Sequence, residues 1–166
     1  MDRKRQIKPM EQIAPSEDGA QVLVRAAKST DLPAISRLDE RITGVSKPAY
    51  WQEMMRRYGG EAVEHYFLMA ETGDGTLLGF VIGEIRAWEF GSPPAGWVFA
   101  INVDPETRLG GIGTRLFDEV CARFKTAGVR SVRTMVDRRD HLILSFFRSQ
   151  GMMAGPSLEL EMEIRS

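Results

Sequence analysis

The chain has 166 residues, 43% of them hydrophobic, which suits one packed domain rather than two. Its 22 basic and 23 acidic residues leave a net charge of −1, so no overall field favours nucleic acid or an anionic membrane as a partner. A single cysteine, Cys121, excludes an internal disulfide, and His65 and His141 lack metal-ligand spacing. We therefore expect a cytoplasmic protein without a metal, nucleic-acid or membrane partner.

The first residues are polar and contain no apolar segment of the kind found in signal peptides. No apolar run approaches the roughly 20 residues that a membrane span needs. We interpret residues 1–20 as a flexible N-terminal arm and residues 21–166 as the folded domain.

The first half of the chain alternates strand and helix patterns. Residues 21–27 predict a strand, and residues 29–42 predict a helix with Pro33 in its first turn and apolar residues at helical spacing. A second helix is predicted over 47–58, where two glycines follow it. Residues 65–71 and 77–88 predict two strands, and the glycine-containing TGDGT turn between them indicates a hairpin.

The second half begins with prolines and glycines in EFGSPPAG, which disfavour regular structure over residues 89–96. Strands are then predicted over 97–103, which is apolar on both faces, over 131–137, and over 158–164, where apolar and acidic residues alternate strictly. Helices are predicted over 112–127, with Cys121 beside its apolar stripe, and over 142–150. This order predicts an α/β fold with one mixed, mainly antiparallel sheet flanked by about four helices.

Three glycines and an arginine lie between the strand 97–103 and the following helix, in the string ETRLGGIGTRLF. Glycines there allow several N–H groups to point at one anion at the positive end of a helix, and they also allow a tight turn with close packing. A P-loop is excluded because Gly113 is followed by Thr114, and a dinucleotide fingerprint is excluded because Leu116 stands where the third glycine belongs.

The longer string VDPETRLGGIG resembles the acyl-coenzyme A pyrophosphate loop of the GNAT superfamily of N-acyltransferases, and the order of strands and helices over about residues 21–164 agrees with that family. The resemblance implies that pyrophosphate binds to the loop, and that the pantetheine arm runs beside Ile101 and Val103. Leu109 and Gly110 depart from the family, where glycine and a basic residue are common. The implied cofactor-binding residues of the loop are Arg108, Leu109, Gly110, Gly111, Ile112, Gly113 and Thr114.

The resemblance also locates a position beside the thioester. Many members of the family carry a tyrosine four residues before the glycine that ends the last helix, as the acid that protonates the thiolate. Here Phe147 occupies that position, and a phenyl ring cannot donate a proton. Asp140 corresponds to a family asparagine, or else it is a plain N-cap of the helix.

Acyl transfer to an amine also needs a neutral amine. Glu84, before Glu89, is the candidate base, because both lie where the substrate cleft of the family opens, although carboxylates on strands are also common as solvated surface groups. The aromatic residues Tyr50, Trp51, Trp88 and Trp97 are either walls of an acceptor pocket or part of the core.

The sequence therefore indicates an acetyl-coenzyme A-dependent N-acetyltransferase that acts on a primary amine of a small molecule or a protein. The alternative is a module that binds acyl-coenzyme A without turnover, an alternative that Phe147 keeps open. The sequence does not identify the acceptor amine, the preferred acyl chain or the oligomeric state, a homodimer included.

Overall fold

The computed structural model describes residues 22–60, 63–107 and 110–164, so the predicted arm lies outside the described residues. The elements follow the predicted order closely. In chain order they are β1 (Leu23–Ala26), the short 3-10 helix η1 (Ser29–Asp31), α1 (Leu32–Thr43), α2 (Pro48–Tyr58), β2 (His65–Glu71), β3 (Leu77–Arg86), the 3-10 turn η2 (Glu89–Gly91), β4 (Ala95–Val103), α3 (Ile112–Thr126), β5 (Val132–Arg133) and α4 (His141–Ser149).

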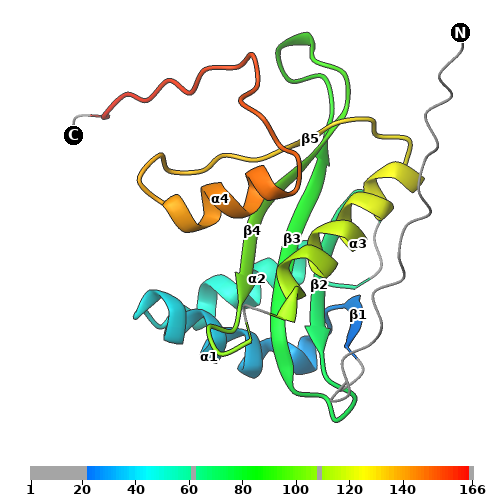
Figure 1. The fold of residues 1–166 in the computed structure, drawn as a ribbon, viewed down its shortest axis with the longest axis vertical. Helices are drawn as coiled ribbons and strands as arrows, with labels where there is room; N and C mark the ends of the chain where they lie inside the picture. Colours follow the sequence, from blue (N-terminus) through cyan, green and yellow to red (C-terminus); the bar gives the residue numbers. More distant parts are fainter. Residues whose placement is uncertain (1–21, 61–62, 108–109, 165–166) are drawn as a thin grey trace, which may run out of the picture.

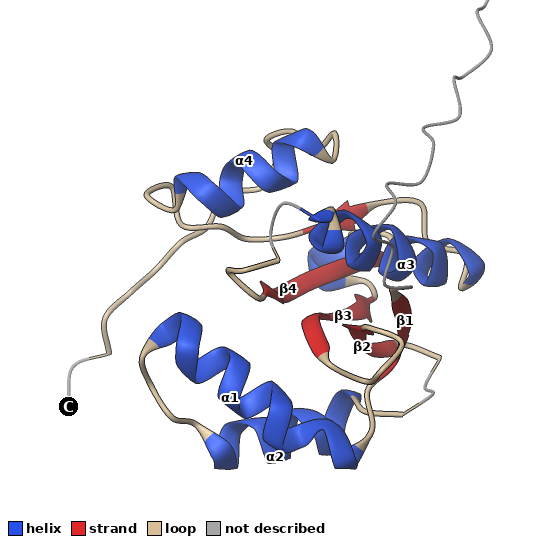
Figure 2. Ribbon diagram, turned by 60° about the horizontal axis from the view of Figure 1, so that its bottom comes forward, coloured by secondary structure: helices blue, strands red, loops and turns tan. Residues whose placement is uncertain are grey.

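The five strands form one sheet in the order β1-β2-β3-β4-β5. The first three pairings are antiparallel, and only β4 and β5 run parallel, which confirms the predicted mixed, mainly antiparallel sheet. Helices α1 and α2 lie on one face of the sheet, whereas α3 and α4 lie on the other (Figures 1 and 2).

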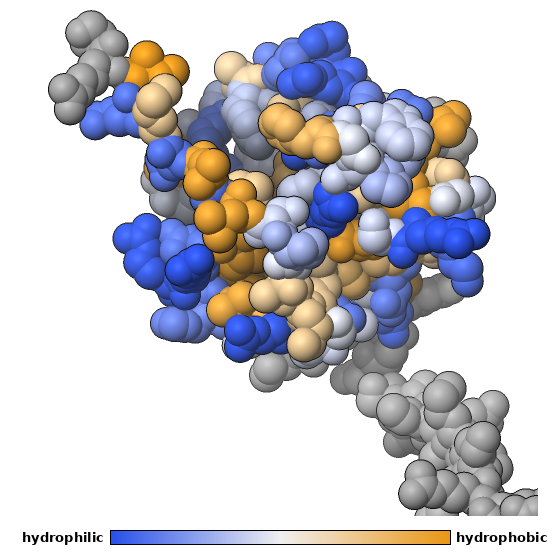
Figure 3. All heavy atoms as spheres, turned by 90° about the horizontal axis from the view of Figure 1, so that it is seen from above, coloured by the Kyte–Doolittle hydropathy of each residue, from blue (hydrophilic) through white to orange (hydrophobic). Residues whose placement is uncertain are grey.

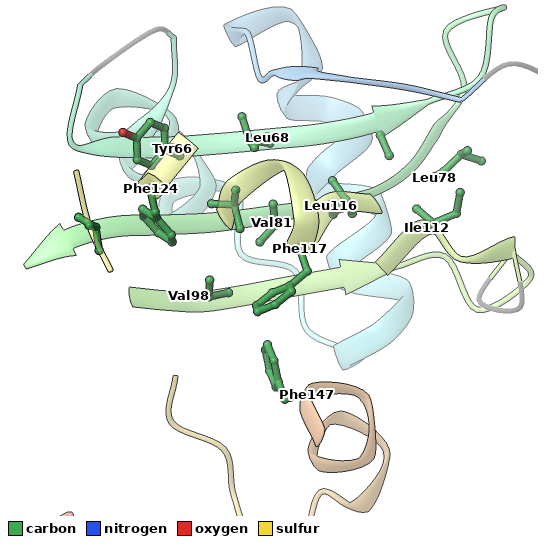
Figure 4. Packing of buried hydrophobic residues seen from close by; sticks show 13 residues of the cluster. Tyr66, Leu68, Leu78, Val81, Val98, Ile112, Leu116, Phe117, Phe124 and Phe147 are labelled. Atoms are coloured by element: carbon green, nitrogen blue, oxygen red, sulfur yellow. The ribbon is translucent and has the colours of Figure 1, made fainter. Parts of the chain in front are cut away.

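Alternation along the central strands divides the core between these two faces. On β2, Leu68 belongs to the cluster that includes Phe117, Phe124 and Phe147 of helices α3 and α4 (Figure 4). Its neighbour Phe67 belongs to the cluster under α1 and α2. Successive side chains of a strand point to opposite faces, so a nearly continuous apolar strand serves both cores.

The structure places Cys121 and the two histidines in different surroundings. Cys121 packs against the cluster under α3, as the helical stripe predicts, and burial raises the pKa of its thiol to about 11. His141 is exposed. His65 is half-buried, with its ring against that of Tyr58.

Three predictions about elements need correction. Residues 158–164 form no strand and lie in an extended, exposed path, because no neighbouring strand pairs with them. The strand predicted over 131–137 is limited to Val132–Arg133, since the chain turns away from β4 after that point. The segment 89–96, predicted to lack regular structure, contains η2 and the first residues of β4.

No helix within residues 22–60, 63–107 and 110–164 has both the length and the apolar character needed to cross a membrane.

Candidate active site

The two parallel strands separate soon after they meet. Strand β5 pairs with β4 at Gly96 and Trp97 only, and the Thr134 hydroxyl then donates a hydrogen bond to the carbonyl of Val98 at 2.7 Å. Beyond this point β4 continues to Val103, and no strand among the described residues pairs with it on that side. Backbone groups of β4 between the two strands are therefore available to a ligand that pairs as an added strand.

A cavity of about 410 Å³ occupies this separation. Its walls come from α1 and α2, from residues 98–103 of β4, from residues 134–137 after β5, and from α4. Ile101 and Val103, the predicted pantetheine-binding residues, line it together with Phe147. The sequence thus correctly identified residues that the fold brings to one cavity, although their ligand-binding role stays a prediction.

A second cavity of about 190 Å³ leads from Ile101 and Val103 to the first turn of α3. Its lining includes Gly111, Gly113 and Thr114 from the glycine-containing loop. Gly110 is exposed beside it, Ile112 points into the core, and Arg108 and Leu109 lie outside the described residues. The two cavities share Ile101 and Val103, so the cavity at the loop adjoins the cavity between the separated strands.

The start of α3 is suited to an anion. Gly111 is the N-cap residue, with φ +70°, a left-handed conformation that side chains disfavour. A helix offers no intrahelical acceptor to the amides of its first turn, which here belong to Ile112, Gly113 and Thr114. The first turn contains no acidic residue, and the last turn contains Arg123 and Lys125, which complement the helix dipole.

The loop before α3 is anchored at its beginning by Asp104, which is buried. Its carboxylate accepts hydrogen bonds from the Arg41 guanidinium at 2.5 Å and from the backbone N–H of Glu106 at 3.1 Å. These contacts fix the chain where it leaves β4 and connect it to α1.

Close packing explains one of the loop glycines. A side-chain carbon at Gly113 would lie 3.0 Å from the ring of Phe146 on α4. The ring of Phe147 in turn packs edge-on against Phe117 of α3, with 5.8 Å between centroids (Figure 4). The tight-turn interpretation of the glycines therefore applies, since Gly113 allows α3 and α4 to approach and Gly111 shapes the turn, whereas anion binding stays a prediction.

Asp39 of α1 is the buried carboxylate of the larger cavity. One of its oxygens accepts a hydrogen bond from the Trp51 indole at 3.0 Å and lies 2.9 Å from the Lys47 ammonium. Its other oxygen faces the side-chain amide of Asn102 on β4 at 3.5 Å. A carboxylate held in this way can bind an ammonium group, as its contact with Lys47 shows.

The predicted bases lie elsewhere. The carboxylate of Glu84 accepts a hydrogen bond from the Tyr58 hydroxyl at 2.9 Å and another from Arg86 at 2.6 Å. Burial, and then this carboxylate, raise the pKa of Tyr58, so the phenol stays protonated and donates. Glu89 is exposed in η2. Among the described residues that line the two cavities, neither glutamate occurs.

Of the other predicted residues, some line the larger cavity and some do not. Asp140 caps α4 by accepting the N–H of Ile143 at 3.0 Å, which confirms the capping interpretation, and it also borders the larger cavity. Tyr50 and Trp51 line that cavity, whereas Trp88 and Trp97 do not. In the part of the chain that the structure describes, no three His, Cys, Asp or Glu side chains gather where they could hold a metal ion.

Sequence reasoning missed Asp39, Lys47, Asn102 and Thr134. Each comes from a different segment, and the sequence contains no spacing that relates them. The sequence contained a signal for Asp39 alone. This aspartate lies inside the apolar stripe of a predicted helix, where a charged side chain requires partners.

The comparisons with known proteins agree with this geometry. The family model described as "Acetyltransferase (GNAT) family" matches residues 32–152. No curated protein sequence matches the chain.

Solved structures share the fold at low sequence identity. The aminoglycoside 6′-N-acetyltransferase AAC(6′)-Ih from Acinetobacter baumannii has a TM-score of 0.74 and 18% identity, over 87% of this chain and 100% of that one. The aminoglycoside N-acetyltransferase AAC(6′)-Iy in complex with CoA has a TM-score of 0.73 and 18% identity, over 90% and 99%. A transcriptional regulator from Bacillus halodurans C-125 has a TM-score of 0.72 and 18% identity, over 87% and 100%.

Proposed function

We propose that this chain, which belongs to the GNAT acetyltransferase family, transfers the acetyl group of acetyl-coenzyme A to a primary amine of a small molecule or a protein. One observation carries the proposal: the cavity at the amide-rich start of α3 adjoins, at Ile101 and Val103, the cavity along the side of β4 that no described strand covers beyond Trp97. Pyrophosphate at the first site and a pantetheine arm along the second account for both features.

In this proposal the cofactor extends from Gly111 and Thr114 towards Ile101. The amides at the start of α3 hold the pyrophosphate, with Arg108 adding positive charge. Backbone groups near Ile101 and Val103 pair with the pantetheine amides, which directs the thioester towards Phe147 and the larger cavity.

The acceptor amine enters the larger cavity from the side of α1 and α2. Lys47 places an ammonium 2.9 Å from the buried Asp39 carboxylate, and an acceptor ammonium that replaces Lys47 makes the same contact. The half-exposed Lys47 side chain can move towards solvent. Aminoglycosides, the substrates named for two of the structural relatives, are primary amines of this kind and belong in a first acceptor panel.

Acyl transfer also requires a base for the acceptor ammonium and an acid for the departing thiolate. Glu84, before Glu89, is the proposed base, and water carries the proton from the acceptor in the cavity to the Glu84 carboxylate, which Tyr58 and Arg86 hold by hydrogen bonds. Phe147 cannot protonate the departing thiolate, so water serves as the acid. A thiol pKa of about 8.5 makes the thiolate a tolerable leaving group.

The alternative, a module that binds acyl-coenzyme A without turnover, is supported by one observation. Phe147 is buried against Phe117 and Phe146, so the position is filled by packing and carries no acid.

Two measurements separate these functions. Calorimetry with coenzyme A reports binding, and release of free thiol from acetyl-coenzyme A reports turnover with each member of a panel of aminoglycosides, polyamines and peptides. Binding with acceptor-dependent thiol release supports the enzyme, and binding without release across the panel supports the module. Absence of binding would refute both.

A further inference from the structure

Lys47 stands at a position that helix formation alone does not explain. It is the N-cap residue of α2, and its side chain makes no capping hydrogen bond. N-cap positions favour Ser, Thr, Asp and Asn, and the positive end of the helix dipole disfavours a cation in the first turn. The reason for a lysine at this point therefore lies in the contacts of its side chain.

Those contacts are in the larger cavity. The Lys47 ammonium lies 2.9 Å from the buried Asp39 carboxylate and 5.8 Å from the centre of the Tyr50 ring, and all three residues line that cavity. Hydrophilic side chains ordinarily lie at the surface, as Figure 3 shows for one face of the molecule. Lys28 and Lys125 are exposed in this way. Among the described lysines, only Lys47 lines the cavity.

This ammonium lies close to the part of β4 that the proposed function assigns to the cofactor. Asn102 stands between Ile101 and Val103 on β4, and its amide faces the other oxygen of Asp39 at 3.5 Å. Helices α1 and α2 cover one face of the sheet and α4 lies on the other (Figure 2), and the cavity is lined from both. An amine from α2 and a thioester directed towards α4 therefore share one cavity.

We propose that Lys47 is a site of self-acetylation, at which the chain transfers the acetyl group of bound acetyl-coenzyme A to its own side chain. This inference rests on the proposed function, because the same cofactor supplies the acetyl group. Lysine has a flexible four-carbon stem, so the amine can move from Asp39 towards the thioester without a change in the backbone. Placing both groups in one cavity makes the reaction intramolecular, which accelerates it.

Asp39 acts as the base in this reaction. Its oxygen, 2.9 Å from the ammonium, takes one proton and passes it to solvent, and the lone pair of the amine then forms an N–C bond with the carbonyl carbon of the thioester. The C–S bond breaks, and coenzyme A leaves as a thiolate that takes a proton from water. The nitrogen loses its second proton to water, so the products are acetyl-lysine, the free thiol and one proton.

The modification changes the charge of the cavity. The amide that forms is neutral, so Asp39 loses the cation that it contacts in the unmodified chain. In the proposed function an acceptor ammonium binds to the same carboxylate in place of Lys47. Self-acetylation removes this competitor and prepares the site for an acceptor.

Mass spectrometry of the full chain after incubation with acetyl-coenzyme A alone tests the proposal, on peptides that report each lysine separately. Lys47 should gain an acetyl group at least about 10-fold faster than Lys28 and Lys125, although these two are exposed and free to react chemically with the thioester. The rate constant should stay the same from 1 to 100 μM chain, because the reaction is intramolecular. Lys47→Arg should remove the fast reaction, and Lys28→Arg is the matched control that should keep it.

A second variant tests the geometry. Asp39→Asn keeps an oxygen for the Trp51 indole but removes the charge that holds the ammonium. It should slow acetylation of Lys47 by at least about 10-fold and leave Lys28 and Lys125 unchanged, and thermal unfolding checks that it folds.

Three results would overturn the proposal. They are equal rates at the three lysines, a Lys47 rate constant that rises with chain concentration, and an unchanged Lys47 rate in folded Asp39→Asn. Coenzyme A binding and acceptor-dependent thiol release are measured on the same samples. If both occur while Lys47 stays unmodified, self-acetylation alone fails, whereas absence of coenzyme A binding refutes the proposed function together with it.

Discussion

Replacing Gly111 with aspartate should weaken the binding of coenzyme A by about 30- to 150-fold relative to the asparagine variant. Gly111 is exposed at the N-cap of α3, with φ +70° and open space where a side-chain carbon would be. Aspartate and asparagine both tolerate this backbone conformation, and each adds the same volume and the same competition for the first-turn amides. The two variants therefore differ mainly by one negative charge.

The magnitude follows from Coulomb's law. Two unit charges 4 Å apart repel by about 4 kcal/mol at an effective dielectric constant of about 20. Exposure of this turn to solvent reduces the repulsion between the new carboxylate and a bound pyrophosphate to about 2–3 kcal/mol, which corresponds to the stated range of affinity.

Isothermal titration calorimetry with coenzyme A measures the difference, and thermal unfolding of both variants checks that they fold alike. Equal affinities for the aspartate and asparagine variants, with both folded, would refute a pyrophosphate site at the start of α3. Increasing salt should narrow the difference between them, because it screens an exposed interaction.

Four further predictions concern single side chains. Phe147→Tyr should leave thiol release unchanged or raise it at neutral pH, since the new hydroxyl stands at the position of the family's acid; a loss of turnover with unchanged coenzyme A affinity would contradict this. Glu84→Gln should lower turnover and shift its pH profile upward, because an amine of pKa near 10 is only about a thousandth neutral at pH 7; an unchanged rate and profile would exclude Glu84 as the base. The thiol of Cys121, whose pKa burial raises to about 11, should react with iodoacetamide at pH 8 at least ~10-fold more slowly in the native than in the urea-unfolded chain; equal rates would contradict its burial. Arg25→Met should cost about 2 kcal/mol of unfolding free energy at pH 7, because Arg25 holds the pKa of the Asp31 carboxyl below its ordinary value through a contact at 2.8 Å. That stabilisation is present above the unfolded pKa of about 3.9 and is lost as the pH falls through the lower folded value, so urea titrations of the two proteins should converge in acid.

Local signals predicted most of the elements. The strand His65–Glu71 has the predicted bounds, and α3 differs from its prediction by one residue at its end. Apolar period, capping residues and turn glycines act within a few residues, so they are readable along the chain. The position of Gly111 at the start of a helix belongs to the same class of local information.

The cavity could not be read in this way, because its walls depend on where two strands separate. Nothing in residues 131–137 shows that pairing with β4 stops at Arg133. Asp39 reaches Lys47 through the connection between two helices and meets Asn102 from a distant strand. Glu84 lies on a strand whose bounds were nearly correct, yet its side chain forms pairs with Tyr58 and Arg86 outside both cavities.

The segment 158–164 shows a different relation between pattern and structure. Strict alternation specifies which face of a strand is buried, but a strand also needs backbone hydrogen-bond partners that its own residues cannot supply. Within the described residues the chain leaves both requirements open, because no strand pairs with the segment and its four large apolar side chains are exposed. The alternation therefore predicts which side chains of the segment share a face, whereas a strand forms only where a neighbouring backbone supplies the hydrogen-bond partners.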